Sequence, residues 1–108
     1  MGISSVMATS LSGMQAQTKR LAATAGNVAN AATPGYDRQT TGLSETAGGG
    51  VSATVTPSGA PTAPDGSNVD LADEMTTVIE TRTAFAANAA VFETGADMWQ
   101  MLMTMKRD

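Results

Sequence analysis

The chain has 108 residues, a formal net charge of −4 and few aromatic side chains, so we expect at most one small domain. Its acidic balance gives no basis for nucleic-acid binding, and the absence of histidine and cysteine removes the usual metal ligands and most nucleophile–base pairs. We therefore expect no catalytic residue, cofactor or metal, and predict that the protein is not an enzyme. No apolar run approaches the roughly 18 residues of a membrane span. The N-terminus lacks the features of a cleaved signal peptide.

Residues 1–32 predict a first helix that packs on another helix. Apolar or small residues recur there in steps of three and four, which is the 3.5-residue period of a coiled coil. Ser4 or Ser5 could cap its start. Gly13 and Gly26 weaken it as an isolated helix, so we expect it to depend on a partner. The larger members of this stripe are predicted interface residues: Met7, Leu11, Met14, Leu21 and Val28.

Residues 33–68 form a middle segment rich in Gly, Pro, Thr and Ser. The run from Thr33 to Tyr36 contains Pro-Gly, which ends the helix and is typical of a type II turn. Residues 51–56 alternate apolar and polar side chains and predict a short strand. The triplet Gly48–Gly50 lacks the lysine and hydroxyl residue of a phosphate loop, so we interpret it as a plain loop. We expect an exposed, flexible segment with at most one short β element.

Residues 69–108 predict a second, longer helix. An unbroken alternation of three- and four-residue steps starts at Leu71, and no proline follows Pro64. Asp70 is a good N-cap, and acidic residues in the first turn suit the positive end of the helix dipole. A helix about 57 Å long must pair with another helix, in this chain or in another copy. Its predicted interface residues are Leu71, Met75, Val78, Phe85, Phe92, Trp99 and Met103.

These segments predict an all-α fold, in which two long terminal helices form a coiled-coil hairpin joined by the flexible middle. If Ala32 lies beside Leu71, the numbers of paired residues add up to about 103, and Arg20 lies within about a turn of Glu80. Trp99 would then cover the start of the first helix or pack on another subunit. Gly95 either permits close approach of a neighbour or marks a bend.

Charge is divided unevenly between the two predicted helices. Residues 1–36 carry only Lys19 and Arg20, whereas five acidic residues lie between Asp70 and Glu93. This asymmetry favours pairing of the two helices with each other. The alternative is that the two basic residues only keep one helix face in water, because exposed ion pairs contribute little.

Two motifs, one near each end, resemble those of bacterial flagellar rod and hook proteins. The first is Asn27-Val28-Ala29-Asn30 followed by Thr33-Pro34-Gly35-Tyr36, and the second is the run from Asn68 to Met75. Two separate motifs in this order are more specific than a heptad pattern alone. The resemblance assigns a family role to the following residues of the first motif: Asn27, Asn30, Thr33, Pro34, Gly35 and Tyr36.

The resemblance implies a structural subunit of the flagellar basal-body rod, which crosses the periplasmic space. Such a subunit is exported by the flagellar type III apparatus without a cleaved signal peptide. It polymerises through its terminal helices with other rod subunits and with copies of itself. The short middle segment fits a rod protein rather than a hook protein, and the run Gln17–Leu21 and the chain length are most similar to those of a proximal rod subunit. The alternative is a soluble coiled-coil adaptor or export chaperone that binds another protein through its methionine-rich stripe.

Overall fold

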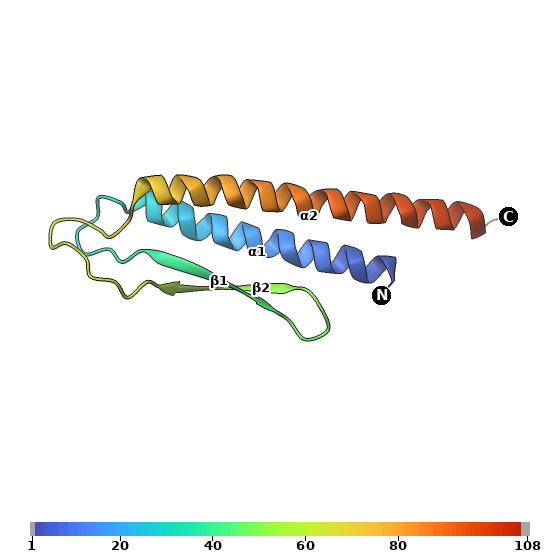
Figure 1. Cartoon of the computed structure of the whole chain (residues 1–108), viewed down its shortest axis with the longest axis horizontal. Helices are drawn as coiled ribbons and strands as arrows, with labels where there is room; N and C mark the ends of the chain where they lie inside the picture. The colour runs from blue at the N-terminus through green and yellow to red at the C-terminus, as the bar shows by residue number, and fades with distance from the viewer. Residues whose placement is uncertain (1, 107–108) are drawn as a thin grey trace.

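A computed structural model describes residues 2–106 as two long helices and one β-hairpin (Figure 1). The elements in order are α1 (Ile3–Ala29), β1 (Gln39–Glu45), β2 (Val51–Pro57) and α2 (Leu71–Lys106). The molecule is elongated, with extents of 70 × 25 × 14 Å. Among these elements α1 is the middle layer, because it contacts both α2 and the hairpin, whereas α2 contacts only α1. The predicted hairpin of two long helices is confirmed.

The two helices begin differently. In α2 the predicted cap is confirmed, because Asp70 Oδ1 accepts hydrogen bonds from the backbone N–H groups of Ala72 and Asp73, at 2.9 and 3.4 Å. In α1 the predicted serine cap is wrong. The N-cap position is Gly2, which makes no side-chain capping bond, so Ser4 and Ser5 already lie inside the helix.

The middle segment contains a β-hairpin rather than one short strand. The predicted strand is confirmed as β2. Its antiparallel partner β1 was not predicted, but the two-stranded hairpin is consistent with the expectation of at most a short β element. Side-chain hydroxyls join the strands on the exposed face, between Ser44 and Ser52 and from Thr40 to the Thr56 carbonyl. Such cross-strand contacts stabilise a strand whose own sequence has no alternating pattern.

The Gly48–Gly50 triplet forms the tip of this hairpin, in agreement with the prediction of a plain loop. All three residues have positive φ. The tip lies against α1, because the Val51 N–H donates a 3.1 Å hydrogen bond to Ser12 Oγ. A Cβ atom on Gly50 would come within 2.9 Å of the same oxygen. Glycine is therefore required at this position both by its φ of +105° and by the close approach.

The core between the layers is made of small and polar side chains. Ala16 is the only buried hydrophobic residue among those described. The other buried positions of the two helices are Ser10, Gly13, Gln17, Thr24 and Asn27 on α1 and Glu74, Thr81 and Gly95 on α2. Such a core contributes little apolar burial, and the free energy that large buried side chains would supply is missing from this chain alone.

The register differs slightly from the predicted one. Asn27 contacts Glu74 and Gly13 faces Asn88, and in both pairs the residue numbers add up to 101 rather than 103. The predicted proximity of Arg20 and Glu80 is confirmed, since they form a 3.0 Å ion pair. The predicted register was therefore displaced by about half a turn of helix.

Candidate assembly surface and the clasp that positions it

Asn27 ties three parts of the chain together at the closed end of the helix pair. Its side chain is 1 % exposed. Its amide nitrogen donates to the Gln39 carbonyl at 2.9 Å and to Glu74 Oε1 at 3.0 Å. Its Oδ1 accepts from the Gln39 N–H at 2.8 Å and from the Tyr36 hydroxyl at 3.0 Å. One side chain thus binds β1, the turn and α2 to α1.

Glu74 is the acidic partner in this network and is fully buried at 0 % exposure. Its Oε1 also accepts a short hydrogen bond from Arg38 Nε, which completes an ion pair. A buried carboxylate is unfavourable unless it is paired and hydrogen-bonded, and Arg38 and Asn27 both stabilise Oε1, whereas the buried Oε2 has no hydrogen-bond partner. The sequence had indicated only a dipole-compensating role for Glu74 in the first turn of α2.

The rest of the first motif shapes the chain as it leaves α1. The Asn30 amide donates to the Gly26 carbonyl at 2.9 Å, and the Thr33 hydroxyl donates to Asn30 Oδ1 at 3.1 Å. The Tyr36 N–H donates to the Thr33 carbonyl at 3.2 Å, and Gly35 has a φ of +74°, so the predicted type II turn is confirmed. We call Asn27, Asn30, Thr33–Tyr36, Arg38 and Glu74 the clasp.

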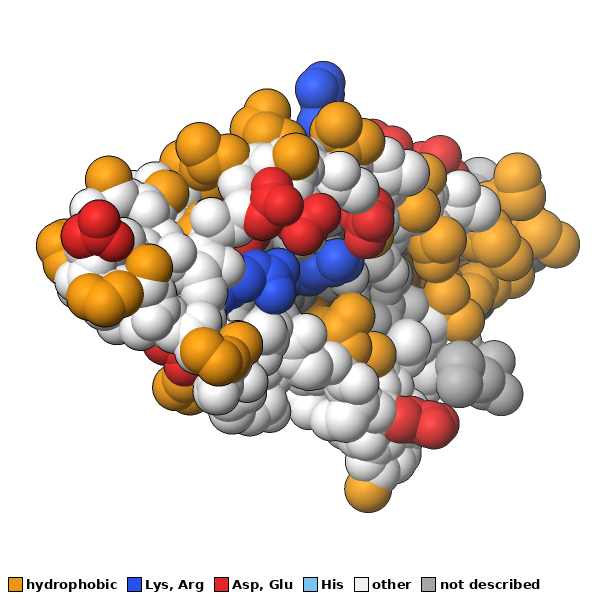
Figure 2. Space-filling view, turned by 60° about the vertical axis from the view of Figure 1, so that its left-hand side comes forward, with side chains coloured by type: hydrophobic (Ala, Val, Ile, Leu, Met, Phe, Trp, Pro, Cys, Tyr) orange, Lys and Arg blue, Asp and Glu red, His pale blue; other side chains and the backbone are white. Residues whose placement is uncertain are grey.

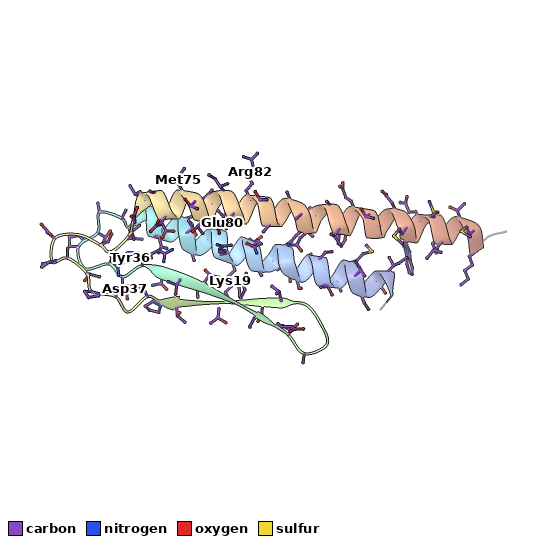
Figure 3. All side chains as sticks on the ribbon, in the orientation of Figure 1. Lys19, Tyr36, Asp37, Met75, Glu80 and Arg82 are labelled. Carbon is purple, nitrogen blue, oxygen red and sulfur yellow. The ribbon has the colours of Figure 1, made fainter. Side chains whose placement is uncertain are left out.

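Asp37 organises the base of the β-hairpin beside the clasp (Figure 3). Its Oδ1 accepts from the Ser58 hydroxyl and from the Asn68 amide, and its Oδ2 accepts from the Gly59 N–H at 2.9 Å. The hydrogen bond from Ser58, followed by those from Asn68 and Gly59, holds the pKa of Asp37 below its ordinary value. Asn68, from the second motif, therefore connects the hairpin to the start of α2.

Two glycines let α1 and α2 approach each other closely. A Cβ atom on Gly13 would lie 2.5 Å from Asn88 Oδ1, and one on Gly95 would lie 2.7 Å from Met7 Cγ. Gly95 was expected either to permit the close approach of a neighbour or to mark a bend, and its contact with Met7 shows the close approach. The closely spaced helices leave no room between them for large side chains.

The predicted interface residues lie beside this seam rather than inside it. Several buried positions of α1 and α2 directly precede a predicted one, as Gly13 precedes Met14 and Glu74 precedes Met75. None of the twelve predicted residues is buried. Met7, Met14, Val78 and Phe92 are half-buried, and the exposed members are Leu11, Leu21, Val28, Leu71, Met75, Phe85, Trp99 and Met103. Their role as an interface with other chains stays a prediction.

Part of this apolar stripe lines a groove between the helices, which we call the α1–α2 groove. It encloses about 450 Å³ and is lined by Gln17, Thr18 and Leu21 of α1 and by Val78, Thr81, Arg82 and Phe85 of α2. Thr18 and Phe85, whose numbers add up to the 103 of the predicted register, thus line one groove. The Arg82 side chain extends outward from α2 (Figure 3), as expected for a cation that keeps its charge in water.

The C-terminal end of α2 extends beyond the start of α1 (Figure 1). Met98 still lines a pocket with Ile3 and Val6 of α1, and we call residues 99–106 the overhang. Residues 98–105 carry no charge, and their large apolar side chains are exposed, so hydrophobic atoms gather at this end of the molecule (Figure 2). Trp99 lies with Leu102, Met103 and Lys106 in a shallow pocket of the overhang itself. The expectation that Trp99 covers Ile3 and Ser4 finds no support in this pocket.

Residues 2–106 show no sign of a metal or membrane-spanning site. No three acidic side chains gather there in a way that could hold a metal ion. Neither helix in this range is long and apolar enough to cross a membrane. The features that stand out are the clasp at one end, the overhang at the other and the apolar stripe between them, which together define an elongated helical-hairpin protein with outward-facing apolar side chains.

Comparison with known proteins places this architecture in a family. Residues 7–36 match the family model described as flagella basal body rod protein, and residues 65–105 match the one described as flagellar basal body rod FlgEFG protein C-terminal. The chain belongs to the flagellar rod and hook family. The two matches include the whole first motif and nearly all of α2.

Several flagellar hook proteins named FlgE are similar to part of the chain. The one from Rhizobium meliloti is 42% identical over 43 residues, which are 40% of this chain and 11% of that protein. Those from Brucella suis and Brucella abortus are 42% and 48% identical over 41 residues, which are 38% of this chain and 10% of each protein. The match thus spans about a tenth of the length of these relatives.

Proposed function

We propose that this protein is a structural, non-enzymatic subunit of the flagellar basal-body rod, which polymerises through its two terminal helices. The proposal rests on one observation in this family member: small and polar side chains are buried between its helices, whereas large apolar side chains are exposed. Polar and small residues such as Gln17 and Gly13 fill the seam inside the chain, while Leu21, Phe85 and Trp99 are exposed.

This distribution favours association with further chains. Burying a Leu, Met or Phe side chain contributes roughly 1.5–3 kcal/mol, and the isolated chain gains little of it. Monomeric proteins rarely expose apolar surfaces that are contiguous over many residues. The partners that fit are other rod subunits and further copies of this chain, whose helices would cover the stripe along α1 and α2.

Assembly from an exported, unfolded chain is the mechanism that we infer. The subunit would pass through the flagellar type III export apparatus without a cleaved signal peptide and order its helices fully at its position in the rod, within the periplasmic space. Ordering on association lowers the affinity per unit area but suits addition at the end of a growing filament. The small polar core fits a chain that is held only weakly folded until neighbours cover it.

Among rod subunits we propose the proximal rod protein C, FlgC, as the subtype. The connection between α1 and α2 carries only one short β-hairpin, and such a short connection fits the resemblance to rod proteins better than that to hook proteins. The Gln17–Leu21 run of α1 supports the same assignment.

Deletion of the gene in the native host tests the proposal. We expect loss of flagella with basal bodies that stall before the hook, restored by expression of the full chain. Normal flagella in the deletion strain would contradict a rod function. A purified chain that forms one soluble oligomer of fixed size and binds another flagellar protein would favour the adaptor instead.

A further inference from the structure

The α1–α2 groove has apolar walls and an unsatisfied polar floor. Leu21, Val78 and Phe85 line it together with Gln17 and Thr81. Gln17 is 6 % exposed and Thr81 is 2 % exposed, and neither Gln17 Oε1 nor Thr81 Oγ1 has a hydrogen-bond partner. Because a buried acceptor without a donor is unfavourable, the groove fits a large apolar group that carries one hydrogen-bond donor.

Trp99 has this chemistry. Its indole has a wide apolar surface and a single N–H group that can only donate. It is 49 % exposed on the overhang, next to Leu102 and Met103. The charge-free run of residues 98–105 lets this part of the helix enter an apolar groove without burying an unpaired charge.

A chain cannot place its own Trp99 in its own groove. Trp99 and Phe85 lie on the same continuous helix, α2, and the 14 residues that separate them span about 21 Å along its axis. The indole that fills the groove must therefore come from a second molecule.

We propose that the α1–α2 groove binds Trp99 of a second copy of this chain, with the indole N–H donating to Gln17 Oε1. The inference rests on the proposed function and names the two surfaces that meet. The groove and the overhang are different surfaces, so the contact between them is heterologous. When copies add head to tail, each one leaves one free groove and one free Trp99, and the contact then extends into an open filament.

The chain contains a single tryptophan, so its fluorescence reports on Trp99 alone. The test mixes two full-length variants. W99F keeps the groove but has no tryptophan, and L21K keeps Trp99 but carries a charge in the groove wall. We expect wild-type emission to shift to shorter wavelength as concentration rises, no shift for L21K alone, and a restored shift when W99F is added to L21K.

Leu11→Lys is the matched control. Leu11 and Leu21 are 44 % and 45 % exposed on the same stripe of α1, but Leu11 does not line the groove. L11K should keep the shift of the wild type. Gln17→Leu, which removes the acceptor and keeps the volume, should raise the concentration at half-maximal shift about 2- to 10-fold.

Circular dichroism checks that each variant keeps its helices, and T18R, at an exposed position of the groove, replaces L21K if L21K loses helicity. The proposal is overturned if the emission of the W99F and L21K mixture does not shift, or if L21K alone shifts like the wild type. It is also overturned if the emission of the wild type stays that of an exposed indole at every concentration. The deletion experiment does not involve the groove. If the deletion strain has stalled basal bodies but the mixture of W99F and L21K shows no emission shift, the Trp99 contact is overturned and the rod function is not.

Discussion

Glu74 of α2 accepts a 3.0 Å hydrogen bond from Asn27 of α1, and both side chains are buried at the closed end of the molecule. Asn27 belongs to the first sequence motif and Glu74 to the second, so the bond joins the two parts of the chain by which the family is identified. The motifs therefore specify how the helices are held together, and the apolar stripe provides the surface that faces outward.

Asn27→Ala should destabilise the isolated chain. The substitution removes four hydrogen bonds and leaves the Gln39 backbone and the Glu74 carboxylate short of partners, which should lower the free energy of unfolding by about 1–3 kcal/mol. Thermal unfolding followed by circular dichroism measures the effect. Asn30→Ala, which loses only local bonds beside the turn, is the control. An equal loss for both variants would argue against a central role of Asn27.

Replacing each of three helix glycines, Gly13, Gly26 and Gly95, by alanine should change the free energy of unfolding in different directions. At Gly13 the new Cβ would meet Asn88, whose amide is already bonded to the Ala84 carbonyl, so we expect a loss of about 1–3 kcal/mol. At Gly26 the nearest atom is 4.0 Å away, and the higher helix propensity of alanine should give a gain of up to about 1 kcal/mol. Gly95→Ala should lie between them, because the flexible Met7 side chain can move. Melting temperatures that rise for Gly13→Ala would contradict the close approach.

Acid should weaken the base of the β-hairpin through Asp37. Because hydrogen bonds in the folded state hold its pKa below the ordinary value, the ionised carboxylate stabilises the fold at neutral pH. This stabilisation is lost as the pH falls below the ordinary pKa of aspartate and through the lowered folded-state pKa. Melting of the wild type and of Asp37→Asn over a pH series should show a difference at neutral pH that disappears in acid. A difference that is independent of pH would exclude this origin.

Cysteine pairs test the helix register, since the native chain has no competing thiol. Thr24 and Thr77 lie one turn from the Asn27–Glu74 contact on both helices and line the same pocket. The pair Thr24→Cys with Thr77→Cys should close readily within one chain, because a disulfide needs Cα atoms within about 7 Å. Met14→Cys with Ala89→Cys follows the register expected from the sequence alone and should close poorly. The reverse result would restore that register.

Phe85→Asp should separate folding from assembly. Phe85 is exposed in the α1–α2 groove, so the isolated chain should keep its helices. A charge in a surface that becomes dry on association is unfavourable, and incorporation into basal bodies should be abolished while export continues. Thr83→Asp, at an exposed position outside the groove, serves as the control. Motility assays and immunoblots of purified basal bodies provide the readout, and normal motility of the Phe85 variant would show that this face is not an assembly surface.

The sequence predicted the period of the helices better than their orientation. The three–four spacing was correct over α1 and α2, but it selected the face with large apolar residues such as Leu21, whereas the buried face holds Gly13, Gln17 and Thr24. A hydrophobic pattern cannot reveal a seam made of small and polar side chains. The pattern instead marks the stripe that we propose to be buried in the assembly.

Two other features could not be predicted because they depend on contacts distant in the sequence. Strand β1 has no alternating pattern, and its pairing with β2 and contact with α1 stabilise it. Glu74 has the features of an exposed helix-start residue until Arg38 and Asn27 are brought to it. Asn27 itself was marked only by the resemblance to a family, since no physical pattern distinguishes it from other asparagines in the sequence.

The polar clasp at one end also determines how the two helices can separate. Between α1 and α2, the side-chain hydrogen bonds of the described residues join Asn27 to Glu74 and Arg20 to Glu80, and both lie in the half near the turn. Towards the other end, the helices meet through contacts such as that of Met7 with Gly95. We therefore expect the helices to separate first at the end away from the clasp, because no side-chain hydrogen bond of the described residues joins them there. A neighbouring subunit that bound at this end would replace a contact within the chain by one between chains while the clasp keeps the two helices together.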